Sequence, residues 1–123
     1  MTANKIVQYV IMRKDLLPNK KSKAFSTGAF IAQACHAAAA ALHRFSSTDP
    51  TTRFLNDLEN MTVCVLGVED KIELESLAQT LANGEIPFHL WIEKPENIPT
   101  ALATAPVEKQ AVWELVGHLK LLR

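Results

Sequence analysis

The chain has 123 residues, of which 48% are hydrophobic and 21% are charged, and its formal net charge is zero. This length supports a hydrophobic core without disulfides or metals, so we expect a single domain over residues 1–123. A neutral chain lacks an overall positive field, which disfavours strong non-specific binding to nucleic acid. A polyanion would therefore have to bind a local basic patch.

Cysteines and histidines give no sign of a disulfide or a metal site. Cys35 and Cys64 lie in apolar segments and form no C-x-x-C pair, so we expect buried thiols. The four histidines are scattered, and no ligand set for a metal or an organic cofactor is visible. No secretory signal or membrane span is recognisable, which predicts a cytoplasmic protein with no membrane partner.

The first part of the chain predicts a strand, a basic loop and a helix. Residues 6–12 are a near-continuous apolar run with β-branched members, typical of a strand covered on both faces. The loop over residues 13–23 holds five basic residues and one acidic residue. Ser26 or Thr27 can cap a helix that runs to about residue 45.

A second helix is predicted to begin with Asp49 as its cap and Pro50 at its first helical position. Residues 61–68 form another apolar run, which we interpret as a second buried strand. The buried side of the second helix is expected to contain Phe54, Leu55 and Leu58.

The next segment predicts a helix and a third strand. Asp70 and Glu73 form a capping-box-like pair at the start of this helix, and Asn83-Gly84 marks its end. Residues 88–92 are the third strand, so residues 61–92 are expected to be a βαβ unit with parallel strands. The apolar face of the helix follows the spacing i, i+3, i+4, i+7 and consists of Leu74, Leu77, Ala78 and Leu81.

The last segment predicts a short strand over residues 100–104 and a helix opened by Pro106 and stopped by Gly117. Residues 118–122 are expected to be an extended tail. The order of these elements predicts the α/β class, as a three-layer α/β/α sandwich around a sheet of about four strands. The inward residues of the last helix are expected to be Val107, Ala111 and Leu115.

Ligands of such sheets bind beyond the carboxyl ends of the strands. That edge should collect the basic loop, the turn at Glu69-Asp70, and the loop after the third strand with Glu93, Glu96 and Asn97. Lysines near a helix N-terminus favour an anion such as phosphate. The plain alternative is that these charged side chains are simply solvated.

Two residues of the first helix, Gln33 and His36, lie three positions apart and so share a face that can point at this edge. A histidine among alanines is equally typical of a satisfied, partly buried side chain. Trp91 is expected in the core. Composition and spacing alone thus indicate an α/β domain with a candidate anion site.

Several motifs together resemble the archaeal/eukaryotic type of peptidyl-tRNA hydrolase, and they occur in the family's order. The resemblance implies a mixed four-stranded sheet with helices on both faces and hydrolysis of the ester between a peptide and tRNA. It also implies tRNA as the partner, a role in translation quality control, and a homodimer as an open alternative to a monomer. The motifs are Arg13-x-Asp15-Leu16, Ala32-Gln33-x-x-His36-Ala37-Ala38, Ala105-Pro106 and Gly117-His118-Leu119-Lys120-Leu121. The stretch Leu90-Trp91-Ile92-Glu93-x-Pro95-Glu96-Asn97-Ile98 is similar to the family's short branch of peptidyl-tRNA hydrolase domain-containing proteins.

This chain departs from the family pattern at the start of the first helix. The family has G-K-G-K where this chain has Ser26-Thr27-Gly28-Ala29, so both lysines are absent. The loop after the third strand is also shorter. Loss of a charged oxyanion partner lowers rates by a factor on the order of 10²–10³.

The resemblance implies roles for the residues at this edge. Glu93 matches the family's aspartate and would orient or deprotonate water, while Asn97, Thr100 and the first N–H groups of the helix would donate to the oxyanion. His36 completes the catalytic candidates and, with Gln33, would shape the floor of the site. The substrate-binding candidates are Lys14, Asp15, Lys20, Lys21, Lys23, Thr27, Gly28 and Gln33. Two alternatives stay open: a catalytically silent module that binds tRNA or a protein on the same fold, and an interaction domain that has lost RNA.

Overall fold

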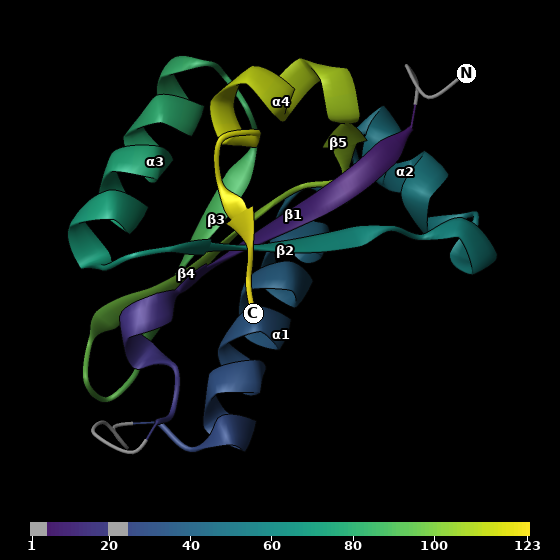
Figure 1. The fold of residues 1–123 in the computed structure, drawn as a ribbon. Coiled ribbons are helices and arrows are strands. Elements are labelled where there is room, and N and C mark those ends of the chain that lie inside the picture. The colour runs from purple at the N-terminus through teal and green to yellow at the C-terminus, as the bar shows by residue number, and fades with distance from the viewer. Residues whose placement is uncertain (1–4, 20–24) are drawn as a thin grey trace.

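The computed structural model describes residues 5–19 and 25–123. In these residues a mixed sheet has the strand order β3-β4-β1-β2-β6, and β5 pairs with β1 beside this path (Figure 1). The predicted α/β class is confirmed, with more strands than the four expected. The elements are β1 (Ile6–Arg13), η2 (Lys14–Leu16), α1 (Thr27–Arg44), α2 (Asp49–Leu55), η3 (Leu58–Asn60), β2 (Val63–Val68), α3 (Lys71–Asn83), β3 (Phe88–Glu93), β4 (Ile98–Thr104), β5 (Val107–Glu108), α4 (Lys109–Val116) and β6 (Lys120–Leu121).

Strand β1 is the centre of the sheet, as its apolar run predicts. It pairs in parallel with β2 and antiparallel with β4, and β4 pairs antiparallel with β3. Strands β1, β2 and β3 therefore point the same way, and their carboxyl ends meet at one edge. The expected common direction of β2 and β3 is correct, but the two are not neighbours, because β4 and β1 lie between them.

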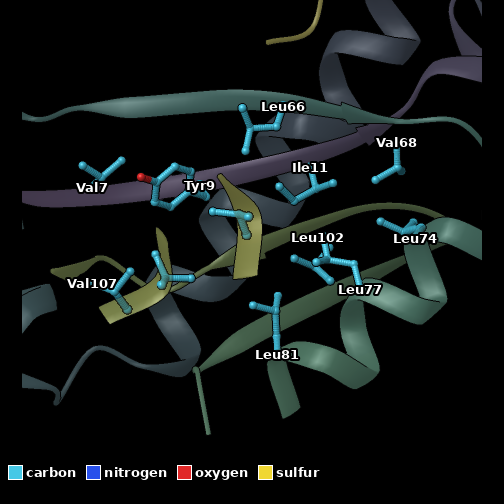
Figure 2. Packing of buried hydrophobic residues seen from close by; sticks show 12 residues of the cluster. Val7, Tyr9, Ile11, Leu66, Val68, Leu74, Leu77, Leu81, Leu102 and Val107 are labelled. Carbon is cyan, nitrogen blue, oxygen red and sulfur yellow. The ribbon is translucent and has the colours of Figure 1, made fainter. Parts of the chain in front are cut away.

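Helices cover both faces of the sheet, which makes the three layers. Helices α3 and α4 bury one core cluster, shown in Figure 2, and α1 packs on β1, β3 and β4 over the other face. Ala37 and Ala41 of α1 are completely buried, so their small side chains let the helix lie close to the sheet. The labelled members of the first cluster include Tyr9, Ile11, Leu66, Leu74, Leu77, Leu81 and Leu102.

The predicted caps of α1 and α3 are confirmed. The Ser26 hydroxyl accepts a hydrogen bond from the Ala29 N–H at 3.1 Å. Asp70 Oδ1 accepts from the Glu73 N–H at 2.9 Å, and the Glu73 carboxylate accepts from the Glu69 N–H, also at 2.9 Å. The bonds to Ser26 and Asp70 satisfy donors that the first turn of a helix leaves unpaired, and the bond to Glu73 ties down the residue before the cap of α3.

The prediction for α2 was wrong in two details. The cap is Thr48, whose hydroxyl accepts from the Thr51 N–H, and Asp49 is the first residue inside the helix. Of the three expected buried residues only Phe54 is buried, whereas Leu55 is exposed and Leu58 is 71% exposed. Helix α2 ends before Leu58, so helical spacing no longer holds there.

The last helix begins later than predicted. Val107–Glu108 form β5, which pairs with Ile6 and Val7 of β1, and α4 starts at Lys109 rather than at Pro106. This delay shifts the buried face of the helix to Val112 and Val116, and leaves Ala111 exposed. Pairing with a distant strand, rather than a local signal, sets this boundary.

Strand β2 is less buried than expected. It starts at Val63, which is 48% exposed, because β6 pairs only with its Leu66 and Gly67. The tail was predicted as extended, and part of it is this short strand. The fourth strand, β4, starts two residues earlier than predicted and is largely buried.

Candidate functional site

The centre of the site is Glu93, the last residue of β3. Gln33 Nε2 of α1 donates to Glu93 Oε2 at 3.2 Å, and Trp91 Nε1 donates to Glu93 Oε1 at 3.0 Å. The Glu93 side chain is half-buried. A carboxylate offers about four lone-pair positions, so two held oxygens still have acceptor sites for water.

Gln33 is itself fixed by buried hydrogen bonds. It is 1% exposed, and its Nε2 also donates to the Ala29 carbonyl at 3.1 Å. Its Oε1 accepts from the hydroxyl of the fully buried Thr100 at 2.8 Å. A chain of hydrogen bonds therefore runs from Thr100 on β4 through Gln33 on α1 to Glu93 on β3.

These contacts lower the pKa of Glu93 below its ordinary value. The hydrogen bond from Trp91 has the largest effect, the bond from Gln33 comes next, and a nearby charge on His36 adds a little, while partial burial opposes them. Donors that bond to the charged form of a carboxyl group favour that form. Glu93 is therefore ionised at neutral pH.

Trp91 and His36 form an aromatic pair beside the carboxylate. Their ring centroids are 4.6 Å apart and their planes differ by 12°. Trp91 was expected in the core, and its half-buried side chain packs against the core cluster under α1, while its indole N–H reaches Glu93. Trp91 and Glu93 are two positions apart on one strand and so share a face, which is the signal in the sequence that could have linked them.

Asn97 lies in the turn between β3 and β4 with a left-handed backbone, at φ 61°. Asparagine tolerates this conformation better than most residues. Its N–H donates to the Glu93 carbonyl at 2.7 Å, and Lys94 Nζ donates to its Oδ1. The side-chain Nδ2 of Asn97 remains a donor, and Asn97 lies at the exposed rim of the site.

Thr100 does not fit the expected role of a direct oxyanion donor. It is completely buried, and its hydroxyl proton is used in the bond to Gln33. The structure gives Thr100 a supporting position behind Gln33 instead.

Arg13 and Asp15 form a bidentate ion pair, with Nε–Oδ1 at 3.0 Å and Nη2–Oδ2 at 2.7 Å. Arg13 Nη1 also donates to the Pro99 carbonyl at 2.9 Å, and its side chain is only 11% exposed. The pair thus ties the loop after β1 to the start of β4. The carboxylate of Asp15, expected at the substrate, is engaged by Arg13.

Lys14 confirms that the loops after β1 and β2 meet at this edge. Its Nζ lies 2.8 Å from Glu69 Oε1. Thr27 and Gly28 are exposed at the start of α1. The other three lysines assigned to substrate binding, Lys20, Lys21 and Lys23, lie outside the described residues.

The expectation of two buried thiols was wrong for Cys35, which is exposed on α1, while Cys64 is partly buried. Within residues 5–19 and 25–123 no group of three His, Cys, Asp or Glu side chains could hold a metal ion. Among the same residues no helix is both long and apolar enough to span a bilayer.

Comparison with known proteins identifies the family. The family described as "Peptidyl-tRNA hydrolase PTH2" matches residues 6–122. A mouse protein named "Putative peptidyl-tRNA hydrolase PTRHD1" is 40% identical over 118 residues, which cover 96% of this chain and 83% of the relative. The human protein of the same name is 39% identical over the same shares of both chains. The chain therefore belongs to the PTH2 family of peptidyl-tRNA hydrolases.

Proposed function

We propose that this protein hydrolyses the ester that joins a peptide, or an N-acylated amino acid, to the 3′ end of tRNA. Ester hydrolysis needs an oriented water, a group that takes its proton and donors for the developing oxyanion. The observation that carries the proposal is the Glu93 carboxylate, held by Gln33 and Trp91 at the carboxyl edge of the sheet. This is the edge at which α/β sheets bind ligands.

In this mechanism Glu93 orients the attacking water and accepts its proton. The lowered pKa of Glu93 keeps the carboxylate ionised at neutral pH. The same lowering makes Glu93 a weaker base, so positioning of water contributes more than proton abstraction. The two fixed donors hold the carboxylate in one orientation, which is the condition for positioning.

The oxyanion is stabilised by the side-chain amide of Asn97 and by N–H groups in the first turn of α1. The Ser26 cap uses the Ala29 N–H, so Thr27 and Gly28 are the residues whose N–H groups would face the substrate. Lys14, with the lysines of the loop after β1, would contact phosphates of the tRNA through salt-sensitive, sequence-independent bonds. Thr100 supports the site by holding Gln33.

The test is release of the acyl-amino acid from an N-acetylated aminoacyl-tRNA by wild type, Glu93→Gln and Glu96→Gln. Glu93→Gln removes the negative charge that orients the water as well as the group that accepts its proton, so we expect a rate lower by at least about 10². Glu96 is exposed on the same loop and makes no hydrogen bond or ion pair within the described part of the chain. Glu96→Gln therefore removes one nearby negative charge and should keep wild-type activity; hydrolysis by Glu93→Gln at the wild-type rate would refute the role of Glu93.

A second candidate, a catalytically silent tRNA-binding module, is favoured by two observations. The start of α1 carries no lysine, and Lys14 is paired with Glu69. If wild type releases no product but binds tRNA with an affinity that falls with salt, this candidate replaces the hydrolase.

A further inference from the structure

A row of side chains leads away from Glu93 along β3 and the neighbouring helix α1. His89 and Trp91 precede Glu93 on β3 at two-residue spacing, which places all three on one face. His36 of α1 stacks on Trp91, and the His89 ring is 6.4 Å from Trp91 at 46°. Arg44, at the end of α1, lies 3.4 Å from the His89 ring through Nη1 and Nδ1.

This row, consisting of His36, Trp91, His89 and Arg44, is accessible from outside. His36 and Arg44 are exposed, and Trp91 and His89 are half-buried. One face of the His36 ring stacks on Trp91, and His36 as a whole is exposed. The row thus offers a supported ring for stacking and a guanidinium group for an anion.

The two ends of the row differ in charge, and the ring between them is neutral. Burial and the nearby Arg44 lower the pKa of His89, so His89 is a neutral ring at pH 7. The positive end is Arg44 and the negative end is Glu93. A ligand that fits carries flat rings along the row, an anion near Arg44 and no anion beside Glu93.

The length of the row matches a few nucleotides. From His36 to Arg44 the helix rises about 12 Å, and stacked nucleotides of one strand are spaced by about 3.4 Å. Single-stranded nucleic acid is bound by this combination of aromatic rings and cations. The carboxylates of an acidic peptide could replace the phosphates, but its acidic side chains have no ring that could stack on His36.

We propose that this row binds the single-stranded 3′ end of tRNA. The terminal base stacks on His36 over Trp91, which places the neighbouring ester at Glu93, and a phosphate further upstream contacts Arg44. This inference rests on the proposed function, since it names where the tRNA end lies in the same site. It also gives Trp91 two roles, as a donor to Glu93 and as the support of the stack.

The first test is the fluorescence of Trp91 during binding of uncharged tRNA. The chain has two tryptophans, so a Trp113→Phe background leaves Trp91 as the sole reporter. An intact tRNA should quench the Trp91 fluorescence saturably. The same tRNA without its 3′-terminal CCA should have an affinity at least about tenfold lower, because each stacked base contributes a factor of about this size. Equal quenching and equal affinity for both tRNAs would overturn the proposal.

The second test uses variants that keep the fold. His36→Ala replaces an exposed side chain in an alanine-rich helix, and it should weaken intact tRNA about tenfold, while His36→Phe keeps a ring and should bind nearly as wild type. Arg44→Ala should reduce the slope of the logarithm of affinity against the logarithm of salt concentration by about one. Lys109 and Trp113 form a cation–aromatic pair on α4, with Trp113 49% exposed, so Lys109→Ala and Trp113→Ala are matched controls that should leave affinity unchanged.

These outcomes separate the row from the hydrolase. Binding of uncharged tRNA involves no ester, so CCA-dependent quenching without hydrolysis would support the row and reject the catalytic role of Glu93. Hydrolysis that is unaffected by His36→Ala, in both KM and tRNA affinity, would reject the row and leave the hydrolase. Affinity lost equally in the α4 controls and in His36→Ala would also reject the row.

Discussion

The buried bond between Gln33 and Thr100 should contribute measurably to stability, whatever the protein does. Gln33→Met keeps the length and helix propensity of the side chain but removes the acceptor of the Thr100 hydroxyl. That hydroxyl is completely buried, and a buried donor without an acceptor costs about 1–3 kcal/mol. Glu93 also loses a donor, but it is half-buried and can bond to water instead.

We therefore expect Gln33→Met to lower the free energy of unfolding by about 2 kcal/mol. In urea this corresponds to a midpoint lower by about 1 M, at a slope of about 2 kcal/mol per M. Circular dichroism across a urea titration measures both quantities. The slope should not change if the native and unfolded states keep their compactness.

The matched variant is Thr100→Val, which has the same shape without the hydroxyl and suits a strand. Because replacing both partners by apolar groups is nearly neutral, adding Thr100→Val to Gln33→Met should recover most of the loss. The double-mutant cycle should then give a coupling of about 1 kcal/mol or more. A loss below about 0.5 kcal/mol in Gln33→Met, within the range of ordinary surface changes, or no recovery in the double variant, would refute the bond as described.

Two further predictions concern the same edge. Trp91→Phe removes the strongest cause of the lowered pKa of Glu93, so the pKa of Glu93 should rise in the variant, which an NMR titration of the carboxyl carbon measures. The wild-type protein should lose stability as the pH falls through the Glu93 pKa, and the variant should lose less. An unchanged pKa would contradict the contact. A Cβ added at Gly67 would lie 2.7 Å from Lys14 Cδ, whereas one at Gly28 would meet nothing within 4 Å. Gly67→Ala should therefore destabilise by about 1 kcal/mol and Gly28→Ala should stabilise by about 0.5 kcal/mol in urea unfolding, and the reverse order would contradict this packing.

Local signals predicted the elements whose ends are set locally. Ser26 and Asp70 have short polar side chains just before apolar helical patterns, and both cap their helices. Strand β5 could not be predicted in this way, because Val107 carries no local strand signal and pairs with Val7 from the other end of the chain. Its boundary is a property of the assembled sheet.

The same distinction applies to the site. The sequence placed Glu93 at the end of a strand and Gln33 on the helix facing it, and both are at the predicted edge. The bond from Thr100 to Gln33 depends on how α1 packs on β4, which no spacing in the sequence specifies. The bond from Trp91 to Glu93 instead follows from their two-residue spacing on β3. Trp91 packs against the core cluster, as expected, and in addition donates to the carboxylate. Thr100 was assigned to the substrate, and the structure bonds its hydroxyl to Gln33 instead.

The most direct test of the central claim is single-turnover hydrolysis of an N-acetylated aminoacyl-tRNA with protein in excess, compared between wild type and Glu93→Gln. Binding of uncharged tRNA to both proteins is measured alongside it, so that a lost chemical step is separated from lost affinity. The account predicts a rate constant at least about 100-fold lower in Glu93→Gln with unchanged tRNA affinity. Equal rate constants in the two proteins would contradict it.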